Sequence, residues 1–106
     1  MFFDEFDAFL DDLNNNPVTD EWYMSNFIDE HIKVLESYEA FNILKQFITY
    51  MIEKYDENSE YEIVEALRYL KLQSNTSEHF YSDEQKGKIL ELYQQEHSKM
   101  SLPEIL

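Results

Sequence analysis

Cysteine is absent from this chain of 106 residues, and glycine and proline are scarce. Without a thiol there is no disulfide, no zinc thiolate site and no cysteine nucleophile, and the composition suits a reducing compartment such as the cytoplasm. The single glycine, Gly87, allows neither a P-loop nor a dinucleotide-binding fingerprint, because both need several glycines where the backbone approaches phosphate. The chain therefore lacks the motifs of common nucleotide chemistry.

Signals for export, membrane insertion and metal binding are lacking as well. The first residues carry no positive charge of the kind that opens a signal peptide, and no apolar run approaches the ~20 residues that span a bilayer. Two segments begin like calcium loops, but Pro17 and Tyr61 stand where such loops need glycine. The histidines are isolated and form no Glu-x-x-His pair of the di-iron type. We expect no metal, no other cofactor, no membrane contact and no enzymatic activity.

Positive charge is scarce, and its distribution is uneven. Acidic residues number 23 against 8 lysines and arginines, a formal net charge of −15 at pH 7. Residues 1–32 contain nine acids and no lysine or arginine. Such a field repels nucleic acid and anionic membranes and attracts cationic surfaces. This pattern predicts a basic protein partner, although acidity that serves solubility alone is the alternative reading.

Apolar residues recur at spacings of three and four, which is typical of amphipathic helices and disfavours strands. The sequence predicts one all-α domain over residues 1–106, a compact bundle of about five helices that is a monomer when free. Helices are expected over about 3–13, from a Thr19 cap to about Glu36, over about 38–55, from a Ser59 cap to about Leu72, and from a Ser82 cap through Tyr93 and Met100.

Three details of this bundle follow from the pattern. The helix over 38–55 has the widest apolar arc and is expected at the centre. Ser59 with Glu62, and Ser82 with Gln85, have the spacing of capping boxes. His31 shares the apolar face of its helix and is expected to be a hydrogen-bonded core residue.

Aromatic residues among the acids are the candidates for a binding site, because tyrosine and tryptophan in a charged rim carry much of the energy of protein interfaces. Packing within the protein is the alternative for each of them. The predicted partner-binding residues are Asp11, Asp12, Asp20, Glu21, Trp22, Asp29, Glu30, Glu57, Tyr61, Glu65, Phe80 and Tyr81.

The segment Ser77-Glu78-His79-Phe80-Tyr81-Ser82-Asp83 places an aromatic pair in a polar, acidic stretch. In this, and in its size and helical acidity, the chain resembles bacterial toxin immunity proteins of the colicin and contact-dependent growth inhibition type. It lacks the proline that follows the aromatic pair in that family. The resemblance implies an inhibitor that covers the basic cleft, or an adjacent exosite, of a nuclease toxin, with Phe80 and Tyr81 in contact.

Two other functions suit an acidic helical domain. One is a phage-type mimic of nucleic acid that blocks a DNA-binding enzyme such as a restriction or CRISPR effector. The other is a regulatory subunit whose apolar tail docks on a larger complex.

Overall fold

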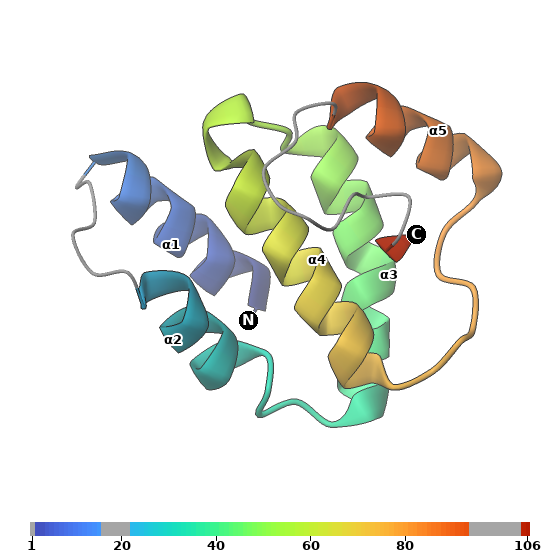
Figure 1. Cartoon of the computed structure of the whole chain (residues 1–106), viewed down its shortest axis with the longest axis horizontal. Helices are drawn as coiled ribbons and strands as arrows, with labels where there is room; N and C mark the ends of the chain where they lie inside the picture. Colours follow the sequence, from blue (N-terminus) through green and yellow to red (C-terminus); the bar gives the residue numbers. More distant parts are fainter. Residues whose placement is uncertain (1, 16–21, 94–104) are drawn as a thin grey trace.

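The described part of the chain forms five α-helices and one short 3-10 turn. The computed structural model describes residues 2–15, 22–93 and 105–106, and within these ranges it contains no strand (Figure 1). The elements are α1 (Phe2–Asn15), α2 (Tyr23–His31), α3 (Ser37–Glu53), η1 (Glu57–Ser59), α4 (Glu60–Ser74) and α5 (Asp83–Leu92). The predicted all-α fold is confirmed. None of the helices in these ranges is both long and apolar enough to cross a membrane. Thr19, the predicted cap of the second helix, and Met100, predicted to lie in the last helix, are outside the described residues.

The capping box predicted at the start of the last helix is present. The Gln85 backbone N–H donates to Ser82 Oγ at 3.1 Å, and the Ser82 backbone N–H donates to Gln85 Oε1 at 2.9 Å. Each bond satisfies a donor that the first helical turn would otherwise leave without an acceptor. At the end of α4, Asn75 adopts a left-handed conformation with φ of 49°, a cap that asparagine tolerates better than most residues.

The prediction of a second capping box, at Ser59 and Glu62, is wrong. Ser59 occupies the N-cap position of α4, as predicted, but it is buried and its side chain makes no cap bond. Asp56 caps this region instead, because its Oδ1 accepts a hydrogen bond of 3.0 Å from the Asn58 backbone N–H. The chain therefore enters α4 through the 3-10 turn η1.

Helix α2 ends five residues earlier than predicted. Its last turn closes where the Ile32 N–H donates to Ile28 O at 2.9 Å, and a turn follows in which the Leu35 N–H donates to Ile32 O at 3.0 Å. Glu36 has an extended backbone and cannot continue the helix. Its N–H donates to Glu39 Oε1 at 3.1 Å, which makes Glu36 the start of α3 rather than the end of α2.

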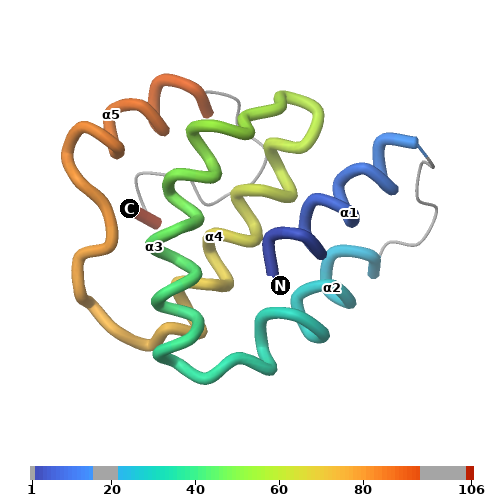
Figure 2. The backbone as a smooth tube through the Cα atoms, turned by 180° about the vertical axis from the view of Figure 1, so that it is seen from behind, coloured from blue at the N-terminus to red at the C-terminus, as the bar shows by residue number. Residues whose placement is uncertain are grey.

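Helix α3 is central, as the sequence predicted. It packs along α4 and against α5, and α2 also packs against α4 (Figure 2). The buried residues of α3 are Ala40, Leu44, Phe47, Ile48, Tyr50 and Met51. They form a wide arc on the helix, as the sequence predicted, and this arc lets α3 contact more than one neighbouring helix.

A cluster of aromatic rings joins α1 and α2 to α3. Phe6 of α1 is fully buried, and its ring centroid lies 5.5 Å from that of Phe27 on α2 and 5.7 Å from that of Phe47 on α3. Such ring pairs add to the free energy of area burial. The cluster fixes α1 and α2 as a pair at one end of the molecule (Figures 1 and 2).

The last two residues return to the core. Ile105 is buried, its carbonyl accepts a hydrogen bond from the Lys71 ammonium, and the Leu106 carbonyl accepts one from the Tyr81 hydroxyl.

The buried side chain of Tyr50 makes the free energy of unfolding depend on pH in the alkaline range. The Tyr50 hydroxyl donates a hydrogen bond of 2.6 Å to Asp7 Oδ1. Burial is the largest cause that raises the pKa of Tyr50 far above its ordinary value, and the Asp7 carboxylate raises it further. An unfolded tyrosine loses its proton near pH ~10, whereas the folded Tyr50 keeps it. The contribution of the protonated Tyr50 to the free energy of unfolding is therefore complete below that pH and is lost as the pH rises above it. Tyr50→Phe should therefore reduce the alkaline loss of unfolding free energy by up to about 1.4 kcal/mol per pH unit.

Urea unfolding at pH values from 8 to above 11 measures this slope. Tyr38→Phe is the matched control, because Tyr38 is an exposed tyrosine of the same helix. Equal slopes for wild type and Tyr50→Phe would contradict a role for the Tyr50 hydroxyl.

Candidate functional site: an acidic groove between α1 and α2

A groove of about 530 Å³ lies between α1 and α2. Each helix contributes residues spaced by three and four positions, which places them on one face. The lining residues are Glu5, Ala8, Phe9 and Asp12 from α1 and Tyr23, Asn26, Phe27, Glu30 and His31 from α2. We call this feature the α1–α2 groove.

Aromatic rings form the apolar part of the groove. The Phe9 and Phe27 rings stack with their centroids 4.4 Å apart, and the Tyr23 ring stacks with Phe9 at 6.1 Å. Phe27 belongs to the core cluster as well. Phe9 and Tyr23 pack against this cluster, so the rings of the groove are anchored to the core.

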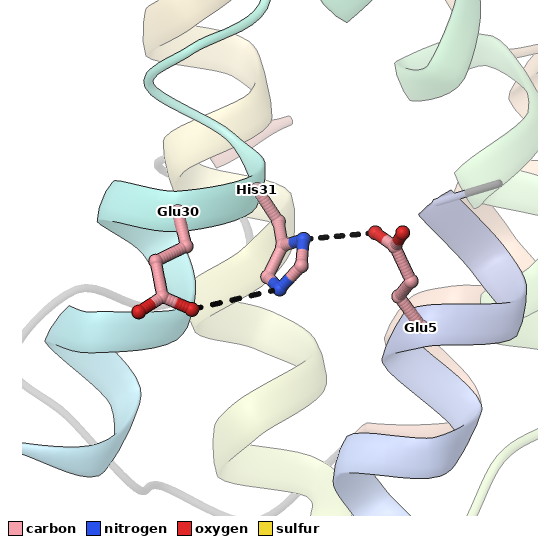
Figure 3. Close-up of polar contacts among 3 residues, drawn as sticks. All are labelled: Glu5, Glu30 and His31. Carbon is pink, nitrogen blue, oxygen red and sulfur yellow. Dashed lines mark ion pairs between the residues drawn. The ribbon is translucent and has the colours of Figure 1, made fainter.

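Histidine and carboxylates form the polar part. His31 Nδ1 lies 2.8 Å from Glu5 Oε2 across the groove, and His31 Nε2 lies 3.9 Å from Glu30 Oε2 on its own helix (Figure 3). The expectation that His31 is a core residue is wrong: its side chain is 29% exposed, and one face of its ring packs on Phe27 at 4.5 Å. His31 is the last residue of α2. Its ring lies between α1 and α2 and is partly exposed, rather than buried in the core.

The electrostatic character of the groove is negative. Three of its lining residues are carboxylates, and neither lysine nor arginine is among the described residues that line it. The pKa of Tyr23 is raised, mainly by burial. The charge of Glu62 on α4 and the neighbouring Tyr61 raise it further. Acidic groups beside apolar walls concentrate negative potential, so the groove suits a cation.

The structure brings several predicted site residues to this region. Asp12 and Glu30 line the α1–α2 groove. Trp22 immediately precedes Tyr23 and is 61% exposed, and Tyr61 is also exposed. The sequence predicted an exposed Trp22 among acidic residues, but it did not predict the groove.

Other predicted residues lie outside the groove. Asp11 lines a neighbouring recess of about 280 Å³ that contains Asp7 and Tyr50. Asp29 is exposed and pairs with Lys33 at 3.2 Å. Glu57 is exposed in the 3-10 turn, and Asp20 and Glu21 lie outside the described residues.

Burial removes three predicted contact residues from the accessible surface in whole or in part. Phe80 is only 9% exposed and belongs to the core, and Tyr81 is half-buried with its hydroxyl bonded to the Leu106 carbonyl. Glu65 is buried and accepts a hydrogen bond of 2.8 Å from Arg68 Nη2. The prediction that Phe80 and Glu65 face a partner is wrong, because both side chains are buried, although residues 77–79 of the loop before α5 are exposed.

Glu5, Phe9 and Tyr23 line the groove but were not predicted as site residues. Glu5 and Asp12 are seven residues apart and share a helix face with Phe9, a pattern that is present in the sequence. Phe9 also fits the apolar spacing of its helix, which is typical of a core residue. Only the pairing of α1 with α2 shows that this face borders a groove.

The arrangement offers charge and apolar surface but no metal-binding cluster. Within the described ranges, no three histidine, aspartate or glutamate side chains are placed to hold a metal ion. No model of a known protein family matches the sequence, and no curated protein matches it.

Proposed function

We propose that the protein binds a basic protein partner through the α1–α2 groove and thereby inhibits it. In line with the resemblance to immunity proteins, the proposed partner is a nuclease toxin, neutralised in the cytoplasm by coverage of its nucleic-acid-binding surface. The protein acts by binding and not by catalysis.

The observation that supports this proposal most is the combination of stacked rings and carboxylates in one groove. A lysine or arginine side chain lays its apolar stem along aromatic surface and keeps its charge near carboxylates. A cation over an aromatic face gains about 0.5–2 kcal/mol. Phe9 and Tyr23 provide the rings, and Asp12 and Glu30 provide the charges.

A nuclease is a suitable partner because its nucleic-acid-binding surface is rich in lysine and arginine. Carboxylates of the groove compete with phosphates for these side chains. Phe80 and Tyr81, on which the resemblance to the colicin type partly rests, do not support the proposal, because Phe80 is buried. The proposal therefore depends on α1 and α2.

The test is the double variant Asp12→Asn/Glu30→Gln, which removes two charges from the groove. We expect it to weaken binding of the purified partner by about tenfold, or 1.4 kcal/mol, and to weaken inhibition of the partner's nuclease activity in proportion. Isothermal titration calorimetry and a nuclease assay measure the two effects.

The matched control is Glu84→Gln/Glu91→Gln, which removes two charges from exposed positions of α5 at the other end of the molecule (Figure 1). Its affinity should change less than twofold. Equal losses for both double variants would show that total charge, and not the groove, determines binding. A partner without nuclease activity would rule out the immunity function.

A further inference from the structure

A second cavity lies away from the α1–α2 groove, beside the C-terminal half of α4. It measures about 610 Å³ and is lined by Arg68, Lys71 and Leu72 of α4, by residues 75–77 of the following loop, and by Ile105. The loop after α4 and the α1–α2 pair lie at opposite ends of the molecule in both views (Figures 1 and 2). The volume falls within the roughly 300–1,000 Å³ of small-molecule sites.

The charge of this cavity is opposite to that of the whole protein. Both charged residues among its described lining are cations, Arg68 and Lys71, although the chain carries −15. They are three residues apart on one helix and therefore share a face. This concentration of two of the chain's 8 basic residues in one cavity requires an explanation.

Arg68 is held in a fixed orientation. Its Nη2 donates to Glu65 Oε2 at 2.8 Å, its guanidinium carbon lies 4.5 Å from the Tyr69 ring centroid, and Nε is enclosed by protein. The hydrogen bond to Glu65 raises the pKa of Arg68, so the side chain stays charged. Because the group is already ordered, a ligand that binds its open side loses little additional conformational entropy.

Lys71 has no carboxylate partner within the described ranges. Its ammonium donates to the Ile105 carbonyl, which uses one of three donors. The asparagine, threonine and serine of residues 75–77 add polar side chains at the same wall.

The remaining walls are apolar. Ile105 is buried and Leu72 is 63% exposed, one of few large apolar side chains on the described surface. An exposed leucine next to a cavity gains free energy when an apolar ligand covers it, about 25 cal/mol per Å² of buried surface.

We propose that this cavity binds a small monocarboxylic acid with a short apolar chain. The carboxylate lies between Arg68 and Lys71, and the chain packs against Leu72 and Ile105. This site is independent of the proposed partner groove.

Charge balance favours a monoanion over a dianion such as hydrogen phosphate. Glu65 balances one of the two cations, which leaves a single positive charge. Lys71 also lies in the last turn of α4, where its charge offsets the partial negative charge of the helix end. In a protein of net charge −15, this small excess does not hold two negative charges.

Hexanoate is the probe. We expect it to bind at least tenfold more tightly than acetate, hexan-1-ol or inorganic phosphate at pH 7 and constant ionic strength. Titration of the ¹⁵N-labelled protein, followed by amide chemical shifts, should localise the changes to residues 68–77. Hexanoate that binds no better than hexanol, or phosphate that binds as well as hexanoate, would overturn the proposal.

Two variants test which residue contacts the carboxylate of the ligand and which contacts its apolar chain. Lys71→Met should weaken hexanoate at least tenfold and leave hexanol unchanged, whereas Lys88→Met, an equal charge change on an exposed site of α5, should have less than a twofold effect. Leu72→Ser alters an exposed side chain, so it should fold, and it should weaken hexanoate but not acetate. Equal effects of Lys71→Met and Lys88→Met, or no effect of Leu72→Ser on hexanoate, would contradict the site.

Discussion

Phe6→Ala is expected to lower the free energy of unfolding by about 3–5 kcal/mol, the range for a fully buried phenylalanine. Phe6 lies at the junction of three helices and is fully buried. Its ring lies within 6.2 Å, between centroids, of the rings of Phe2, Phe9, Phe27, Phe47 and Tyr50. Its removal leaves a cavity that the surrounding rigid rings cannot fill.

The effect on the molecule is large because the total stability of a domain is only about 5–15 kcal/mol. For a chain of this length the midpoint of thermal unfolding should fall by roughly 15 °C or more. Circular dichroism at 222 nm measures it. The control Val34→Ala, at an exposed position, should change the unfolding free energy by less than about 0.5 kcal/mol. A loss below about 1 kcal/mol for Phe6→Ala would mean that α1 is not joined to α3 through this ring.

Trp22→Ala is expected to weaken binding of the basic partner by about 30-fold, or 2 kcal/mol. Trp22 is exposed, makes no side-chain cap bond at the start of α2 and adjoins the groove residue Tyr23. A tryptophan beside a charged groove has the amphipathic surface that interface anchors use. The melting temperature should remain nearly unchanged, because the side chain is mostly outside the core.

Phe80→Ala and Tyr38→Ala are the two comparisons for this experiment. Phe80 is buried, so its replacement should lower stability by about 3 kcal/mol and leave the affinity of the folded fraction unchanged. Tyr38 is an exposed aromatic at the start of α3, and its replacement should change affinity less than twofold.

A loss below threefold for Trp22→Ala would contradict an anchored interface. If successive removal of carboxylates over several helices then weakened binding by similar steps, distributed charge would determine recognition. That behaviour is typical of a mimic of nucleic acid, since phosphate contacts contribute in this additive way.

Part of the candidate site was predictable and part was not. Asp12, Glu30 and Trp22 were identified because charge and aromatic type are properties of the residues themselves. Glu5 and Tyr23 were missed because they line a groove only when the opposite helix, α2 or α1, is in place. The same limit explains Phe80 and Glu65, which have the residue types of an interface but are covered by other parts of the bundle.

The sequence by itself determined the helical class, the central place of α3 and the cap of α5. These features depend on interactions between residues that are close in the chain, such as apolar spacing of three and four and the reciprocal Ser82–Gln85 bonds. Tertiary structure alone decided where α2 ends, that α1 and α2 enclose an acidic groove, and that Arg68 and Lys71 line a cavity with Ile105. Contacts between distant residues, such as His31 with Glu5, have no periodic signal in the sequence, because their geometry exists only after the helices pack.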